Sequence, residues 1–192
     1  MHSISGPVAD ELVARLLPLP FTHLLDVGGA SGTWTMAFLR AVPEARATIF
    51  DLPDAIQQAR DRLAGSPLAG RVQLASGDFY HDELPHGADF GWVSAIIHQH
   101  SREESRELFA KIHRALAPGG WIGVRDVVME PDRVQPLAGA LFAINMLVNT
   151  ERGGTFTFAE IAEDLRSAGF ADPELWLKGD QMDSVVLATR PS

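Results

Sequence analysis

The chain has 192 residues, 46% of them hydrophobic and 21% charged, which is enough for one well-buried domain and too little for two of ordinary size. Its formal net charge of -9, with no local stripe of Lys and Arg, argues against nucleic acid as a partner. The absence of cysteine excludes disulfides and thiolate chemistry, and with no secretory signal or apolar run near the roughly 20 residues of a membrane span we expect a cytoplasmic protein.

The first third of the chain alternates helical and strand patterns. We expect a lead-in helix within residues 1–20, and the apolar run 24–27 predicts a strand that ends in a glycine-rich turn. Apolar residues then recur at helical spacing over 34–41. Residues 47–51 predict a second strand, and a proline at the first position favours a helix over 53–63.

The middle of the chain continues this alternation. Residues 71–75 predict a third strand, and the apolar run 90–97 predicts a fourth. Capping-box spacing over 101–104 begins an amphipathic helix that the Pro-Gly-Gly segment 118–120 ends. Residues 122–129 predict a fifth strand.

The last third of the chain carries two helices and a hairpin. Helical periodicity covers 137–148, and a second capping box at 157–160 begins a helix that Gly169 stops. The strands expected at 175–177 and 185–188 are too close in sequence for a helical crossover, so they must pair antiparallel. Together the elements predict an α/β fold with a Rossmann-like, doubly wound, mainly parallel seven-stranded sheet and an antiparallel C-terminal hairpin.

A glycine-rich turn after the first predicted strand forms the most informative motif. The dinucleotide fingerprint G-x-G-x-x-G fails because Ala30 and Thr33 stand where its second and third glycines belong. The turn instead matches D-x-G-x-x-x-G, with Asp26, Gly28 and Gly32 at the defining positions. That spacing is typical of a turn whose backbone meets the methionine part of S-adenosylmethionine. A turn that serves only close packing is the competing interpretation.

Two further acids follow predicted strands, at the edge where open α/β sheets bind ligands. Asp51 ends the second strand, where a carboxylate can accept both ribose hydroxyls, or alternatively cap the next helix. Asp78 follows the third strand, where it can accept the adenine amino group while Phe79 stacks on the base. A loop acid beside a core aromatic residue is the alternative for this pair.

Five motifs in order give the chain a family resemblance. It resembles the aromatic small-molecule O-methyltransferases, which include plant caffeate and hydroxyindole enzymes and bacterial polyketide-tailoring enzymes. The resemblance runs from about Leu24 to Ala188 and rests on Leu24-Leu25-Asp26-Val27-Gly28-Gly29-Ala30-Ser31-Gly32, Phe50-Asp51-Leu52-Pro53, Gly77-Asp78-Phe79, Ile96-Ile97-His98 and Leu116-Ala117-Pro118-Gly119-Gly120.

The resemblance implies S-adenosylmethionine as the cofactor and a small, aromatic hydroxyl compound as the methyl acceptor. It makes His98 the general base and Asp126 the residue that orients it. It also implies a homodimer, formed through an N-terminal helical domain that these 192 residues do not include. The expected cofactor residues are Asp26, Gly28, Gly29, Gly32, Asp51, Leu52, Asp78, Phe79 and Ser94.

Several positions depart from the family pattern. The usual His-Asp-Trp reads His98-Gln99-His100, and a second acid expected after a Gly-Gly pair is replaced near Phe156. A lysine often found four residues before the histidine is Ser94, which removes one contact on the adenine side. These changes leave open a family member that binds the cofactor and runs another reaction or none, and a non-enzymatic adaptor is a further alternative.

The acceptor is expected against the predicted helix 137–148. Phe142 and Met146 lie on its apolar positions, and Asn145 and Asn149 lie one turn apart where their amides can meet a phenol. Plain core packing of this helix is the alternative. We expect no metal, although His81, His86, His98 and His100 could form a cluster if their loops converged.

Overall fold

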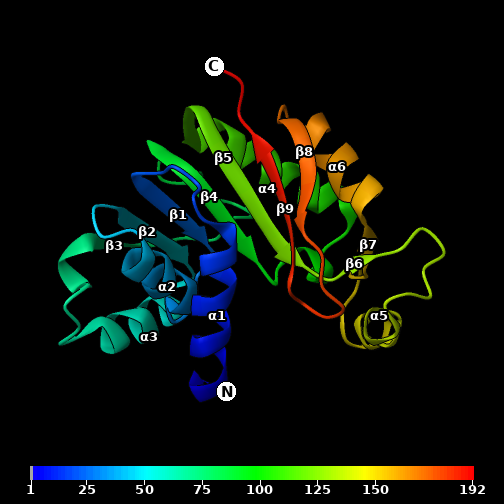
Figure 1. The fold of residues 1–192 in the computed structure, drawn as a ribbon, viewed down its shortest axis with the longest axis horizontal. Helices are drawn as coiled ribbons and strands as arrows, with labels where there is room; N and C mark the ends of the chain where they lie inside the picture. Colours follow the sequence, from blue (N-terminus) through cyan, green and yellow to red (C-terminus); the bar gives the residue numbers. More distant parts are fainter. Residues whose placement is uncertain (1) are drawn as a thin grey trace.

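A seven-stranded sheet forms the centre of the molecule, with strand order β3-β2-β1-β4-β5-β9-β8 (Figure 1). The computed structural model describes residues 2–192 and the side chains of residues 8–192, so Met1 of the expected lead-in segment lies outside the described residues. The first five strands in this order pair parallel, and β9 pairs antiparallel with both neighbours. The strands are β1 (His23–Val27), β2 (Arg46–Asp51), β3 (Val72–Ser76), β4 (Ala88–Ser94), β5 (Leu116–Asp126), β8 (Ala171–Leu177) and β9 (Ser184–Thr189).

Helices cover both faces of this sheet. One face packs against α1 (His2–Leu16), α2 (Thr33–Ala41) and α3 (Pro53–Leu63), through two clusters of buried side chains. The other face packs against α4 (Arg102–Ala115) and α6 (Phe158–Ser167). The fold class expected from the sequence is therefore confirmed, including the antiparallel hairpin.

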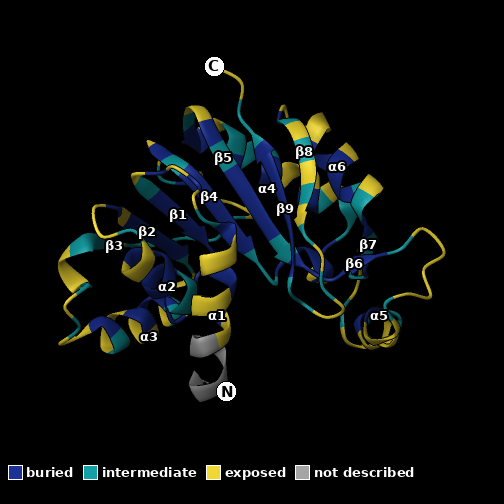
Figure 2. Cartoon of the chain, viewed as in Figure 1, coloured by how far each residue is buried: buried dark blue, intermediate teal, exposed yellow. Residues whose placement is uncertain are grey.

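Burial along each strand follows its place in the sheet. Strands β1 and β4 are buried almost throughout because helices cover both of their faces, as the dark blue centre of Figure 2 shows. Strand β8 alternates between partly buried and exposed residues because it lies at the edge of the sheet. None of the described helices is long and apolar enough to span a membrane.

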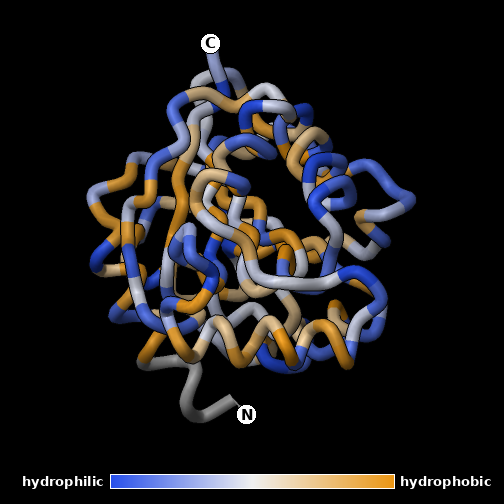
Figure 3. The backbone as a smooth tube through the Cα atoms, turned by 90° about the vertical axis from the view of Figure 1, so that its right-hand side faces the viewer, coloured by the Kyte–Doolittle hydropathy of each residue, from blue (hydrophilic) through white to orange (hydrophobic). Residues whose placement is uncertain are grey.

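A small second unit lies beyond the edge of the main sheet. Strands β6 (Val128–Met129) and β7 (Phe156–Thr157) pair parallel, and helix α5 (Leu137–Asn149) lies between them in the chain. Only Gly139 and Met146 of α5 are buried. In Figure 3 this helix crosses the lower front of the molecule as a largely hydrophobic coil. The alternative of plain core packing for this helix is therefore wrong.

Several predicted boundaries are wrong, including the start of β8, which lies at Ala171 rather than at residue 175. The helix before the Pro-Gly-Gly segment ends at Ala115, and β5 already begins at Leu116 and continues to Asp126 rather than Met129. The chain leaves the sheet there because the Asp126 carboxylate accepts the backbone N–H of Val127 at 2.8 Å. The fourth strand ends at Ser94 rather than at residue 97, because Ala95 has a φ of 60° and turns the backbone out of the extended conformation.

Candidate active site

The predicted site residues come together at the carboxyl edge of the sheet. Asp26 lies in β1 just before the glycine turn, Asp51 ends β2, and Asp126 ends β5. His98 lies on a short 3-10 helix, Ile97–Gln99, that follows β4. Parallel strands carry these residues to the same edge because each strand runs in the same direction.

The glycine turn is shaped by close contacts with the protein itself. Gly28 has a φ of 66°, and a Cβ atom there would clash with the Ile96 side chain. A Cβ atom on Gly29 would lie 2.8 Å from the Asp26 carboxyl carbon. These glycines are therefore required for packing, whether or not a ligand also approaches the turn. Gly32 precedes the first residue of α2.

Asp26 is buried beneath this turn. Its carboxylate accepts a hydrogen bond of 2.6 Å from the Thr35 hydroxyl of α2. The pKa of Asp26 is raised to about 7, chiefly by burial and to a smaller extent by the charge of Asp51. The hydrogen bonds from Thr35 oppose this shift only in part. The Asp26 carboxylate is therefore suited to stabilising the conformation of the turn, and it is not accessible to solvent.

Asp51 connects the second strand to the turn. One of its oxygens accepts the backbone N–H of Ala30 at 2.7 Å, and the other accepts the N–H of Leu52 at 2.7 Å. A carboxylate has about four lone-pair sites, so roughly two remain for further donors. The Leu52 side chain is 52% exposed beside it. This arrangement leaves a partly exposed acid and an apolar surface at the same edge.

Asp78 and Phe79 begin a loop whose exposed Tyr80 reaches the buried His100. The Asp78 carboxylate accepts the N–H of Tyr80 at 2.9 Å, and the Tyr80 hydroxyl lies 2.5 Å from Nδ1 of His100. The rings of Phe79 and His100 meet edge to face at 5.8 Å. Burial lowers the pKa of His100, which the charge of Glu104 partly offsets. His100 is therefore held as a neutral partner of Tyr80 near neutral pH.

His98 and Asp126 form a buried pair. Nδ1 of His98 lies 3.0 Å from each carboxylate oxygen of Asp126. Because a carboxylate only accepts, we assign the proton to Nδ1, which leaves Nε2 as an acceptor. No hydrogen bond to Nε2 is found within the part of the chain that the structure describes. This geometry is suited to taking a proton from a neighbouring ligand.

The predicted acceptor residues share helix α5 and differ in their surroundings. The ring of Phe142 meets the His98 ring edge to face at 4.9 Å, and Met146 is buried. Asn145 and Asn149 are exposed, and the Asn149 amide donates to the Asn145 carbonyl at 3.0 Å. The structure thus brings Phe142 to the histidine and leaves the two asparagines at the surface of the helix.

Two residues of this edge, Arg125 and Arg62, could not be identified from the sequence motifs. Arg125 donates to the Ser94 hydroxyl at 3.0 Å, and its guanidinium lies 4.5 Å from the ring centre of Trp34. Arg62 of α3 donates to the hydroxyl of Ser31 at 2.9 Å and so braces the glycine turn. A signal was available for Arg125 alone, since a charged residue inside an otherwise apolar strand is unusual.

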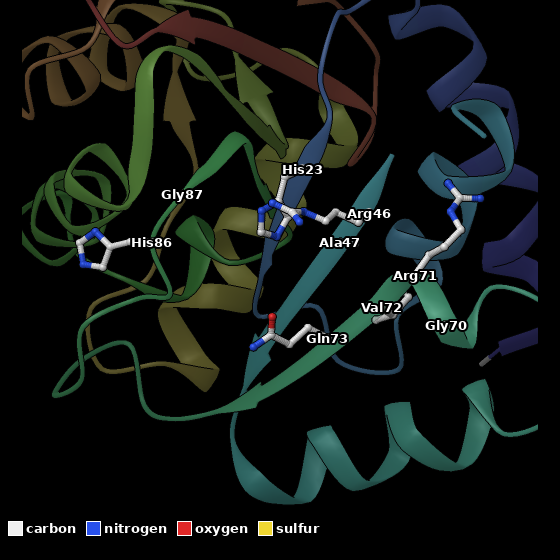
Figure 4. A pocket seen from close by; sticks show the side chains of 9 residues that line it. All are labelled: His23, Arg46, Ala47, Gly70, Arg71, Val72, Gln73, His86 and Gly87. Atoms are coloured by element: carbon white, nitrogen blue, oxygen red, sulfur yellow. The ribbon is translucent and has the colours of Figure 1, made fainter. Parts of the chain in front are cut away.

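A separate hollow of about 440 Å³ opens at the opposite, amino-terminal edge of the sheet (Figure 4). The polar residues that line it are His23, Arg46, Arg71, Gln73 and His86. The Arg71 guanidinium donates to three backbone carbonyls. His86, which lines this hollow, therefore lies away from His98. Among the residues described, no group of three or more His, Asp or Glu side chains could hold a metal ion.

Comparison with known proteins identifies the family. The family model of the O-methyltransferase domain matches residues 1–171. The tetracenomycin polyketide synthesis 8-O-methyl transferase TcmO of Streptomyces glaucescens is 34% identical over 172 residues, covering 90% of this chain and 50% of that protein. The acetylserotonin O-methyltransferase of Gallus gallus is 34% identical over 167 residues, with 87% and 47% covered.

Solved structures agree with the sequence comparison. Human N-acetylserotonin methyltransferase in complex with SAM superposes with a TM-score of 0.81 at 27% identity, covering 98% of this chain and 51% of that one. The chain spans about half the length of the curated relatives it matches. On the family model, the two relatives and the shared fold, the chain belongs to the O-methyltransferase domain family.

Proposed function

We propose that the chain, acting as one catalytic domain, transfers a methyl group from S-adenosylmethionine to a hydroxyl group of a small aromatic molecule. The observation that carries this proposal is the buried His98–Asp126 pair at the same sheet edge as the glycine turn and Asp51. The names of the relatives, a polyketide 8-O-methyl transferase and an acetylserotonin O-methyltransferase, support a small-molecule acceptor.

The residues at this edge fit the cofactor. Asp51 retains about two lone-pair sites, which match the two hydroxyls of a ribose. Asp78 and Phe79 offer a carboxylate for an adenine amino group and a ring for its face, and the exposed Leu52 offers a second apolar contact. Asp26 with Gly28, Gly29 and Gly32 would frame the methionine part. When bound, S-adenosylmethionine supplies an electrophilic methyl group on a positively charged sulfur.

His98 is proposed to take the hydroxyl proton of the acceptor through Nε2. Between a phenol of pKa about 10 and an ordinary imidazole of about 6.5, full proton transfer costs roughly 5 kcal/mol. The Asp126 carboxylate reduces this cost because it stabilises the imidazolium that forms while holding the ring in one tautomer. Alignment of the acceptor oxygen with the methyl group supplies the rest of the rate enhancement.

Helix α5 is proposed to form one wall of the acceptor pocket. Phe142 already contacts the His98 ring, and Met146, one helical turn further along, is buried. Asn145 and Asn149 would place amides at the rim of this wall. We further propose that the chain forms a homodimer, because the exposed apolar side chains of α5 would gain from being covered.

Methyl transfer to a panel of phenols tests the proposal. Replacing the base in His98→Ala should lower kcat by about 10²–10⁴-fold. His86→Ala is the matched control, since His86 lies at the opposite edge of the sheet and should leave kcat unchanged. Unchanged turnover in His98→Ala would contradict the assignment of the base.

The alternative is a domain that binds S-adenosylmethionine without methylating a hydroxyl. The observation that favours it is the commitment of His100 to Tyr80 where relatives of this family usually carry tryptophan. This alternative predicts binding of S-adenosylhomocysteine together with no methyl transfer to any phenol of the panel.

A further inference from the structure

Arg125 is an anomaly among the charged residues of this protein. It lies in β5 between buried residues, and its Nε atom is buried without a hydrogen-bond partner. Removing part of a guanidinium from water is costly unless the lost hydrogen bonds are replaced. Strand positions between buried residues usually carry apolar side chains. A bound ligand that accepts hydrogen bonds from Arg125 would account for an arginine at this position.

The contacts of Arg125 leave most of its donors unused. Of its five N–H groups, one donates to the Ser94 hydroxyl at 3.0 Å, and the guanidinium stacks on Trp34. Burial lowers the pKa of Arg125 and the charges of Asp126 and Asp183 raise it, yet none of the ion pairs in the described part of the chain includes Arg125. Asp126 is already engaged by His98 and the N–H of Val127. Arg125 is thus a partly buried cation with no ion-pair partner among the residues that the structure describes.

The position of Arg125 in the sheet places it beside the proposed cofactor site. Successive strand residues point to opposite faces, so Arg125 points to the α2 face while Asp126 points to His98. Trp34 follows the glycine turn by two residues, and Ser94 ends β4, the neighbour of β1. The guanidinium therefore lies where the turn, β4 and β5 converge.

A cavity of about 500 Å³ adjoins this guanidinium. Arg125 lines it together with Val8 and the loop of residues 179–183, which contributes the carboxylates of Asp180 and Asp183. The Asp183 carboxylate accepts the N–H of Gln181 at 3.1 Å and keeps lone-pair sites free. A cavity lined by one guanidinium and two carboxylates complements a ligand that carries both charges, as the end of an α-amino acid does.

We propose that Arg125 binds the carboxylate of the amino-acid end of S-adenosylmethionine, with Asp180 and Asp183 facing its ammonium group. The assignment rests on the proposed function, since it needs that cofactor at the carboxyl edge. A bidentate contact between a guanidinium and a carboxylate would satisfy the unused donors and supply the missing anion. Arg125 is then a cofactor-binding residue that none of the five family motifs contains.

Calorimetric titration with two ligands isolates this contact. S-adenosylhomocysteine carries the amino-acid end, whereas 5′-methylthioadenosine has the same adenosine and thioether without it. Arg125→Met, which keeps an unbranched apolar stem against Trp34, should weaken S-adenosylhomocysteine about ten- to a hundred-fold and leave 5′-methylthioadenosine within about two-fold of the parent. Arg125→Lys should lose less affinity for S-adenosylhomocysteine, because lysine keeps the positive charge and loses only the bidentate hydrogen bonding of the guanidinium.

Arg46→Met is the matched control, since Arg46 is exposed at the opposite edge of the sheet. It should change the affinity for neither ligand. Equal losses for both ligands in Arg125→Met, or no loss for S-adenosylhomocysteine, would overturn the assignment of Arg125 while leaving the proposed function intact. Failure of the parent protein to bind S-adenosylhomocysteine would instead remove the proposed function, and this inference with it.

Discussion

Asp26 and Asp51 are neighbouring carboxylates whose surroundings give them different chemistry. Asp26 is 1% exposed and accepts a hydrogen bond from the Thr35 hydroxyl. Asp51 is partly exposed and receives two backbone N–H groups directly. The buried acid is therefore suited to shaping the turn, and the accessible acid to meeting a ligand.

The raised pKa of Asp26 predicts a pH dependence of stability. Between about pH 4 and its folded value of about 7, the folded state holds a proton that the unfolded state has released. The free energy of unfolding should then decrease as pH rises through this window, by about 1.4 kcal/mol per pH unit from this group. Denaturant unfolding at several pH values measures it.

Asp26→Asn is the control variant for that measurement, because asparagine cannot titrate. His23, His100 and His113 have lowered pKa values through burial and act in the opposite sense, but they are common to both proteins. The difference in the free energy of unfolding between the parent and Asp26→Asn should therefore change with pH at the slope expected for one titrating proton. Parallel stability curves from pH 4 to 8 would contradict the account of Asp26.

For single residues, the acids of the site could be predicted from the sequence, but the contacts that support them could not. Asp51 could be placed because it ends a recognisable strand, whereas Asp126 fell inside the strand predicted over 122–129 and was identified through the family resemblance. The contacts of Thr35, Arg62 and Arg125 could not be predicted, since each joins side chains brought together only by packing of separate elements. Family resemblance, rather than spacing, supplied the pairing of His98 with Asp126.

At the element scale, α4 and α6 are joined by a cluster of charges. The Asp164 carboxylate is 3% exposed and accepts from Arg102 at 2.8 Å and from Arg106 at 2.6 Å. The Arg102 guanidinium also donates to the exposed Glu163 at 2.7 Å. Two acids of the same helix thus bind the same arginine, one buried and one in solvent.

This arrangement predicts unequal effects of two alanine variants. Asp164→Ala should lower the free energy of unfolding by about 2 kcal/mol, below the 3–5 expected for a fully buried pair because both arginines are partly exposed. Glu163→Ala should cost at most about 0.5 kcal/mol, since solvent screens its interaction. Urea denaturation compares the two, and equal losses would contradict this division.

Element boundaries were predictable where a local signal exists. Both capping boxes form as expected, with Ser101 accepting from Glu104 N–H and Thr157 accepting from Glu160 N–H. The ends of β4 and β5 were misplaced because tertiary contacts determine them. Ala95 adopts a left-handed conformation that carries no sequence signal, and Asp126 turns toward His98.

At the scale of the whole molecule, α5 leaves a hydrophobic face uncovered. Its large side chains include Leu147 at 77% exposure and Val148 at 76%. Exposed apolar surface of this kind favours association, so the chain should self-associate as its concentration rises. The double variant Leu147→Glu with Val148→Glu should shift sedimentation toward the monomer without lowering Tm. Sedimentation unchanged by this variant would contradict a dimer formed through α5.

The two edges of the sheet divide the polar chemistry of the whole molecule. The carboxyl edge gathers Asp51, the His98–Asp126 pair and the glycine turn, whereas the amino edge carries the separate hollow around His23. The position of the site at the carboxyl edge was predictable, because parallel strands bring their carboxyl ends to the same edge of the sheet. The hollow at the amino edge was not predictable, because its lining residues come from three strands, a 3-10 helix and the loop before β4, and no motif connects them.

Calorimetric titration with S-adenosylhomocysteine and with NAD determines whether an adenosyl cofactor binds at the carboxyl edge of the sheet. The parent protein should bind S-adenosylhomocysteine and show no binding of NAD, and Asp51→Ala should weaken S-adenosylhomocysteine at least about ten-fold. Asp10→Ala, which removes an exposed acid paired with Arg40, serves as the control. Tight binding of NAD, or full affinity for S-adenosylhomocysteine in Asp51→Ala, would contradict the account.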